Sequence, residues 1–300
     1  MYVVLGATGH VGSAVADELI GSGASVTVVT RDEDKAAGWR ARGAQAAVVD
    51  VADSDALRAV FKRGRRAFLL NPPAPPSTDT DRAEHRTVAG IVAALDGSGL
   101  EKVVVESAYG AQAGDRLGDL SVLFDFEQAL ARQPIPVTVL RAAYYMSNWD
   151  SLLDQAKNGL LPTMYPPDHA IPMVAPADLG AAAARFLREA PDRTGIRHVE
   201  GPEHYSSGDV AAAFAEALGR DVRLEVTPRD QWEAAYRQLG FSQPAAESYA
   251  RMTAISVDGG FETPAEPERG TITLTRYIAD LVRRDADAAD HQRRALQPAS

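Results

Sequence analysis

Apolar residues in the first half of the chain form short continuous runs, and stretches with helical periodicity separate these runs. In the first such stretch, Val11, Val15 and Leu19 recur every four positions. Strands are predicted at residues 2–5, 25–29, 46–49, 67–70, 103–105 and 137–140. Continuous apolar strands alternating with helices indicate a parallel sheet covered on both faces, because right-handed crossovers lay their helices against the sheet. The pattern predicts a doubly wound α/β fold.

The second half of the chain has a less regular pattern, with five prolines crowded into residues 162–176. Helices are predicted near 178–189, 209–218 and 230–239. We therefore expect residues 1–150 to form a sheet-based domain and residues 151–282 to form a smaller, irregular lobe interleaved with it. Part of that lobe, about 178–205, is expected to return to the sheet, and 283–300 to be a polar tail.

Composition narrows the classes of protein to which the chain can belong. The 300 residues include no cysteine, which excludes disulfides and thiolate chemistry. The formal net charge is -10 and no Lys/Arg-rich run occurs, which argues against direct nucleic-acid binding. No histidine pair has metal-ligand spacing, and no apolar stretch is long enough to span a membrane. We expect a cytoplasmic protein without a metal site.

A glycine-rich turn lies between the first predicted strand and the first predicted helix. Gly6 permits the tight turn, Gly9 lets backbone N–H groups approach a pyrophosphate, and Gly12 allows close packing of the helix. This strand–turn–helix context indicates the phosphate-binding turn of a dinucleotide-binding Rossmann fold. The expected cofactor contacts in it are Gly6, Thr8, Gly9, His10, Val11 and Gly12.

The end of the second predicted strand bears on the choice between NADP and NAD. A carboxylate at this place bonds the ribose 2′-hydroxyl, whereas an arginine accommodates a 2′-phosphate. Arg31 stands where the chain leaves the strand and Lys35 adds a second cation, which favours NADP(H). Asp32 leaves NAD(H) open, because a shift of one residue would place a carboxylate at the discriminating position.

Four stretches together resemble the NmrA-like group of atypical short-chain dehydrogenase/reductases. They are the glycine turn at 6–12, residues 29–35, residues 48–51 and the segment 127–148. The resemblance covers about the first half of the chain and implies further cofactor contacts at the ends of the later strands. These are Asp50 and Val51 beside the adenine, Asn71 and Pro72 along the path to the nicotinamide ribose, and Ser107 and Ala108 beneath the nicotinamide.

The proton-donating Tyr-x-x-x-Lys pair of the wider superfamily is absent, since no tyrosine has a lysine four residues later. Many of the reductases that the chain resembles keep a lysine at the place that is Leu123 or Phe124 here. Reduction of a simple ketone needs a strong acid for the developing alkoxide and is therefore disfavoured, whereas a quinone or other conjugated acceptor depends less on one. The candidate catalytic residues are Ser107, Tyr109 and Tyr144, and Tyr144 is also expected beside the cofactor.

Five aromatic residues between positions 109 and 165 could form the wall of a pocket for a flat substrate. They are Tyr109, Tyr144, Tyr145, Trp149 and Tyr165. Packing in the core is the alternative for most of them. His169 could reach the same cleft as an acid, although its proline-rich surroundings are more typical of an ordinary loop histidine.

Two hypotheses of function follow. The first is an NADP(H)-dependent oxidoreductase that transfers hydride to a small quinone-like or other conjugated electrophile. The alternative is a non-enzymatic NADP(H)-binding redox sensor that acts through a protein partner, as the resemblance to regulatory NmrA-like proteins implies. The complete cofactor turn beside aromatic residues favours the enzyme.

Overall fold

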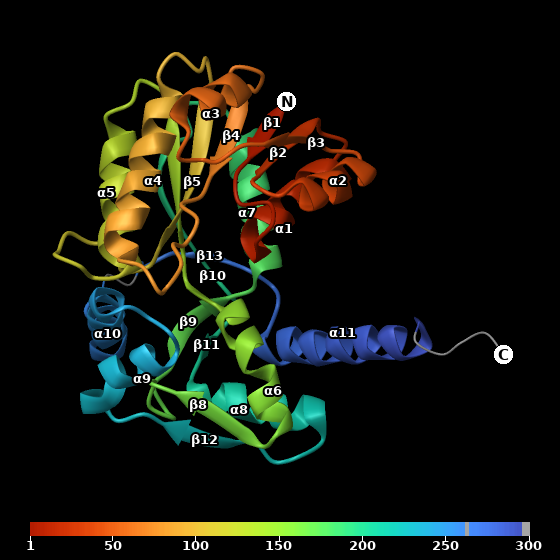
Figure 1. The fold of residues 1–300 in the computed structure, drawn as a ribbon, viewed down its shortest axis with the longest axis vertical. Helices are drawn as coiled ribbons and strands as arrows, with labels where there is room; N and C mark the ends of the chain where they lie inside the picture. The colour runs from red at the N-terminus through yellow and green to blue at the C-terminus, as the bar shows by residue number, and fades with distance from the viewer. Residues whose placement is uncertain (262–263, 296–300) are drawn as a thin grey trace.

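The computed structural model describes residues 1–261 and 264–295, and a parallel sheet of eight strands forms its centre (Figure 1). The strands are β1 (Tyr2–Val4), β2 (Val26–Thr30), β3 (Gln45–Val48), β4 (Arg66–Leu69), β5 (Lys102–Ala108), β6 (Val137–Ala142), β10 (Gly195–Glu200) and β13 (Glu268–Arg269). Their order is β3-β2-β1-β4-β5-β6-β10-β13, and all neighbours are parallel. The strand order reverses between β1 and β4, where open sheets of this kind bind ligands at the carboxyl edge.

Helices cover both faces of this sheet, which confirms the doubly wound fold (Figure 1). One face packs on α1 (His10–Gly21), α2 (Glu33–Ala41) and α7 (Pro176–Arg188). The other packs on α3 (Ser54–Phe61), α4 (Thr80–Leu95) and α5 (Asp119–Ala131). Alternation along β5 shows the two cores directly, since Val104 packs in the first core while Val103 and Val105 pack in the second.

The irregular lobe has its own small sheets and a third apolar core. Its strands are β7 (Tyr144–Tyr145), β8 (Leu160–Thr163), β9 (Ile171–Val174), β11 (His204–Tyr205) and β12 (Arg223–Val226). Its helices are α6 (Leu153–Lys157), α8 (Ser207–Leu218), α9 (Trp232–Gln238), α10 (Gln243–Asp258) and α11 (Leu274–Ala295), with short 3-10 turns at Met146–Leu152 and Arg229–Gln231. The chain passes between sheet and lobe repeatedly, because α7, β10 and β13 all belong to the sheet layer.

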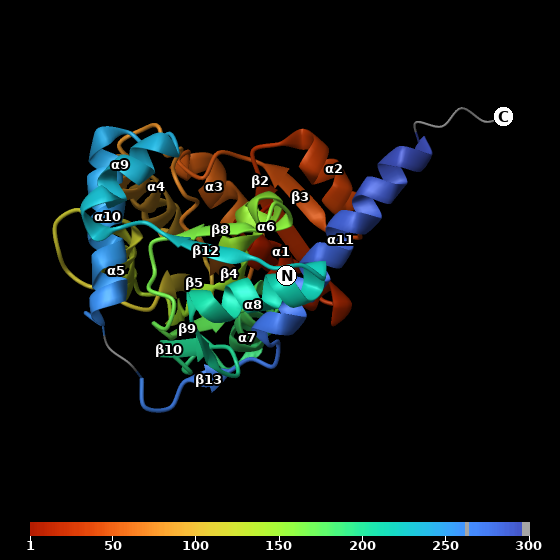
Figure 2. The same cartoon turned by 90° about the horizontal axis from the view of Figure 1, so that it is seen from below.

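The carboxyl-terminal segment differs from the expected tail. α11 begins at Leu274 and continues through 283 to Ala295, while 296–300 lie outside the described residues. Leu274 and Ile278 are buried in the lobe core, so the helix is anchored at its start and its polar end projects away (Figure 2). Within the described part of the chain, the structure contains no helix both long and apolar enough for a membrane span.

Candidate functional site

The glycine turn after β1 is closed on its inner side and open on its outer side. Gly6 has a φ of +68°, in the left-handed region that favours glycine. A Cβ on Gly12 would overlap the Gly6 carbonyl group and lie 2.8 Å from Ala7 N. A Cβ on Gly9 would meet only the Gly6 carbonyl oxygen, at 3.5 Å. The fold therefore requires glycine at positions 6 and 12. At position 9 the missing side chain leaves free space outside the turn.

This free space lies at the N-terminus of α1. Gly9 is the N-cap and has no side chain with which to satisfy the first N–H groups of the helix. The N–H groups of His10, Val11 and Gly12 consequently face an anion site reinforced by the helix dipole. The Trp39 indole donates to the Ala7 carbonyl oxygen at 3.2 Å, which fixes the turn against α2. Thr8 and His10 are exposed at the mouth, whereas Val11 is buried in the core.

The end of β2 places two cations on the same edge of the sheet. Arg31 and Lys35 are exposed, and within the described residues their side chains have no hydrogen bond or ion pair. Asp32 is instead the N-cap of α2, and its Oδ1 accepts from the N–H groups of Asp34 at 2.9 Å and Lys35 at 3.1 Å. Capping therefore engages one oxygen of Asp32, whereas the Arg31 side chain has no partner within the described residues.

The ends of β3 and β4 continue this edge. Asp50 is exposed and accepts from Ala52 N at 3.0 Å, and Val51 packs at the margin of the second core. Asn71 directly precedes Pro72, and its Oδ1 is buried with no partner in the described chain. A buried acceptor without a donor costs about 1–3 kcal/mol, so this oxygen indicates a donor supplied from outside the chain. The residues present thus fit a dinucleotide along the edge.

Ser107 does not present its hydroxyl to this edge. Strand alternation turns its side chain toward α5, where it donates to Glu127 Oε1. Glu127 in turn forms a bidentate pair with Arg141, at 2.9 and 2.7 Å, and all three side chains are buried. The expectation of a catalytic hydroxyl at Ser107 is therefore corrected: the side chain belongs to a buried ion-pair network, and the next residue, Ala108, reaches the cavity described below.

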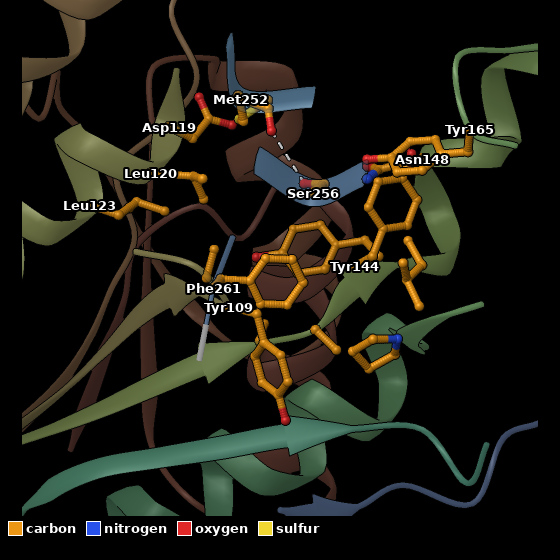
Figure 3. A pocket seen from close by; sticks show the side chains of 16 residues that line it. Tyr109, Asp119, Leu120, Leu123, Tyr144, Asn148, Tyr165, Met252, Ser256 and Phe261 are labelled. Atoms are coloured by element: carbon orange, nitrogen blue, oxygen red, sulfur yellow. Dashed lines mark hydrogen bonds between the residues drawn. The ribbon is translucent and has the colours of Figure 1, made fainter. Parts of the chain in front are cut away.

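Tyr109 also has a different role from the expected one. Its ring lines the cavity, but its hydroxyl points away toward β10 and donates to Glu200 Oε2 at 3.1 Å (Figure 3). Burial and the neighbouring Glu200 carboxylate raise the pKa of Tyr109. The hydroxyl is thus not positioned to donate to a substrate, and the ring is a wall.

A cavity of about 210 Å³ lies at the carboxyl ends of β5 and β6 (Figure 3). Tyr144 lines it, with the Tyr165 ring at 5.6 Å in an edge-to-face contact and the Trp149 ring at 6.1 Å. A second, larger cavity of about 1070 Å³ adjoins it. Five residues line both cavities: Asp119, Tyr144, Asn148, Tyr165 and Met252. Tyr144, Tyr165 and Trp149 therefore form an aromatic wall, and Tyr144 remains a candidate contact of the substrate and the cofactor.

Of the other residues expected at the pocket, Trp149 and Tyr145 line a cavity in the described chain and His169 does not. Trp149 lines the larger cavity, and Tyr145 lines the smaller one while donating to Glu106 Oε1 at 2.6 Å. Burial raises the pKa of Glu106 to about 7. His169 bonds the Ser256 carbonyl oxygen at 3.2 Å and is absent from the described lining of both cavities, so it is a loop histidine.

One side of the smaller cavity, which α5 and α10 provide, was not predicted from the sequence. Asp119 and Leu123 reach the cavity from the first turns of α5, and Met252 reaches it from α10. Of the two candidate positions for the lysine, Leu123 lines the smaller cavity, whereas within the described chain Phe124 lines neither cavity. The start of α10 had a readable signal, an N-cap at Ser242 followed by Pro244 in the first turn.

Comparisons with known proteins agree with this geometry. A family model described as the NmrA-like family matches residues 2–267. The NAD(P)H azoreductase of Xenophilus azovorans is 23% identical, over 85% of this chain and 87% of that protein. The nitrogen metabolite regulation-like protein bik4 of Gibberella fujikuroi is 28% identical, over 79% of this chain and 72% of that protein.

Two solved structures have the same fold. The NADPH complex of the NADPH-dependent quinone oxidoreductase of Escherichia coli has a TM-score of 0.76 and 22% identity, covering 94% of this chain and 99% of that one. The triphenylmethane reductase of Citrobacter sp. has a TM-score of 0.79 and 17% identity, with the same coverage.

Proposed function

The chain belongs to the NmrA-like family, and from this premise we propose that it is an NADPH-dependent oxidoreductase that transfers hydride to a flat, conjugated acceptor without a negative charge, such as a quinone. One observation carries the proposal: the same edge of the sheet holds a set of cofactor-type groups and ends at an aromatic cavity. The groups are the open N-terminus of α1 and, among the described residues, the unpaired Arg31 side chain and the buried Asn71 oxygen that has no donor. Relatives named as an azoreductase and a quinone oxidoreductase support it.

Different residues along the carboxyl edge of the sheet bind different parts of NADPH. The N–H groups of His10, Val11 and Gly12 bind the pyrophosphate, and Arg31 with Lys35 binds the 2′-phosphate. Asp50 and Val51 lie at the adenine, and Asn71 with Pro72 at the nicotinamide ribose. The reduced nicotinamide, when bound, supplies the hydride.

The floor and walls of the cavity orient the acceptor. Ala108 and the Tyr109 ring lie under the reacting end, while Tyr144 and Tyr165 hold a flat acceptor by edge and face contacts. Nearly all of the lining is apolar or aromatic, which excludes water from the reacting atoms.

Charge defines the class of acceptor. Across the described residues, the two cavities have Asp119 and Glu225 in their lining but no lysine, arginine or histidine. An anionic acceptor would lose its hydration without gaining a cationic partner. Acceptors without a negative charge are therefore preferred, and sulfonated or carboxylated ones are disfavoured.

A matched pair of acceptors tests this preference. We expect kcat/KM for 1,4-naphthoquinone to exceed that for 1,4-naphthoquinone-2-sulfonate by about tenfold or more, since an unpaired buried charge costs at least about 1.4 kcal/mol. Each rate is measured by NADPH oxidation and divided by the non-enzymatic rate of the same acceptor. Equal or faster reduction of the sulfonate would contradict the proposed acceptor class.

Arg31→Glu tests the cofactor assignment. We expect the Kd for NADPH to rise about 10–100-fold, because charge-assisted hydrogen bonds to the 2′-phosphate are worth about 1.5–3 kcal/mol. The Kd for NADH should change less than about threefold, since NADH has no phosphate at this position. Calorimetry measures both.

Lys62→Glu is the matched control for the Arg31 variant. It makes the same charge change at the exposed C-cap of α3, which leads into the amino end of β4 on the opposite edge of the sheet. Equal losses for NADPH and NADH in Arg31→Glu, or an equal loss in the control, would refute the assignment.

The proposed activity itself is tested by oxidation of NADPH and NADH against a panel of quinones. Turnover that prefers NADPH is the expected result. Tight NADPH binding without turnover of any acceptor would instead favour the sensor, for which the absence of a lysine at positions 123 and 124 and the regulation-like relative are the supporting observations.

A further inference from the structure

Asp119 is a carboxyl group in the proposed reaction cavity. It is the first residue of α5, it lines the smaller cavity (Figure 3), and it lines the larger cavity as well. Leu123, one of the two candidate positions for the lysine of the resembling reductases, lies one helical turn later on the same face. An acidic group thus stands one turn away from a candidate position of that lysine.

One oxygen of this carboxyl is held and the other is free. The Tyr249 hydroxyl donates to Asp119 Oδ1 at 2.9 Å from α10. Asp119 is half-buried, and the area that it exposes belongs to the cavities that it lines. Asp119 Oδ2 has no hydrogen bond within the described chain, so it is the atom that can carry a proton toward an acceptor.

The surroundings favour the protonated form of Asp119. Burial raises the pKa of Asp119, and the Tyr249 hydrogen bond opposes this by lowering it. The titratable groups that face it from the packed elements are Tyr249 of α10, Tyr236 of α9, Glu84 of α4 and Tyr145 of β7. Glu84 has a pKa raised to about 8, first by burial and then by Asp119. None of these groups is a cation that would hold Asp119 as a carboxylate.

We propose that Asp119 is the catalytic acid of this cavity and that Tyr249 is its positioning residue. The inference rests on the proposed function. The acceptor gains a hydride from the reduced nicotinamide and a proton from Asp119 Oδ2 to its oxygen, so a quinone becomes a hydroquinone and the nicotinamide is oxidised. Asp119 is left as a carboxylate and regains its proton from water. The absence of a Tyr-x-x-x-Lys pair is thereby compensated from the start of α5.

Asp119→Asn tests the proposal with two acceptors that differ in their need for a proton. 1,4-Naphthoquinone needs a hydride and a proton, whereas the N-methylacridinium cation becomes neutral on taking a hydride alone. We expect kcat for the quinone to fall about 100-fold, within the usual contribution of a general acid. The rate with N-methylacridinium should change less than about threefold. Asparagine keeps the volume and still accepts from Tyr249.

Asp125→Asn is the matched control. Asp125 lies on the same helix but is exposed and pairs with His85 at 3.1 Å, outside the described lining of both cavities. We expect this variant to reduce both acceptors at the wild-type rate. The control separates loss of the proton donor from a general effect of removing a carboxylate from α5.

Tyr249→Phe supplies a second measurement, the pH profile. If protonated Asp119 is the active form, the quinone rate falls as pH rises through its pKa. Removing the Tyr249 hydrogen bond raises that pKa further, so the falling limb should move to higher pH. In Asp119→Asn the limb should disappear.

The outcomes separate this inference from the function on which it rests. Wild-type protein that turns over no acceptor would overturn both. An active wild type whose Asp119→Asn variant reduces the quinone equally fast would overturn the inference alone. Equal losses with quinone and N-methylacridinium would also overturn it, because they indicate disturbed hydride transfer instead of a missing proton.

Discussion

Gly12→Ala is expected to weaken NADPH binding by at least about 100-fold. The added Cβ would overlap the carbonyl group of Gly6, and these are backbone atoms that cannot rotate away as a side chain can. The turn must then open, and the N–H groups of α1 lose their alignment on the pyrophosphate. Two lost charge-assisted hydrogen bonds of about 1.5–3 kcal/mol each account for this magnitude. Calorimetry with NADPH measures it.

Two further glycines of the same region serve as controls. Gly21→Ala lies at the far end of α1, where a Cβ would meet nothing within 4 Å, and should bind NADPH as the wild type does. Gly9→Ala should fold normally, with a thermal midpoint close to that of the wild type, yet bind more weakly, because its Cβ occupies only the outer space. Wild-type affinity in both Gly12→Ala and Gly9→Ala would remove the turn from the cofactor site.

Arg141→Ala should lower the free energy of unfolding by about 3–5 kcal/mol. It removes the bidentate partner of Glu127, whose carboxylate then remains buried beside the Ser107 hydroxyl alone. Leaving one charge of a buried pair uncompensated typically costs this much, since the lost attraction no longer offsets the desolvation of the carboxylate. Urea unfolding followed by tryptophan fluorescence measures the change.

A surface pair provides the comparison. Arg42→Ala breaks the ion pair of Arg42 with Asp17, in which both side chains are about half exposed, and should cost less than about 1 kcal/mol. Combining Arg141→Met with Glu127→Leu should recover much of the stability lost in Arg141→Ala, because no buried charge is left over. A cost below about 1 kcal/mol for Arg141→Ala would show that water or another group compensates Glu127.

The buried pair also explains why Ser107 differs from its predicted role. Ser107 and Arg141 are register partners on β5 and β6, and both point to the face that α5 covers. The network therefore fixes the strand ends that carry Ala108 and Ala142 into the cavity. Ser107 supports the floor of the proposed site from behind.

The sequence by itself determined the central sheet and predicted a cofactor site at one edge of it. Runs of apolar residues predicted six of the eight parallel strands, and the glycine turn and Arg31 were recognised from their places after β1 and β2. These features depend on periodicity and on neighbours a few residues away. Because parallel strands bring their carboxyl ends to one edge, chain order alone also predicts that Asp50 and Asn71 lie on the same edge as the turn.

Only the tertiary structure decided which side chains enter the cavity. Tyr109 bonds Glu200, which is 91 residues away, and Asp119 bonds Tyr249, which is 130 residues away. Which way a hydroxyl points, and whether a carboxyl lies in solvent or against a buried tyrosine, depends on the elements that pack over it. Such contacts join segments with no local relation in the sequence, so no periodicity or spacing encodes them, whereas hydrogen bonding and burial in the folded chain fix them.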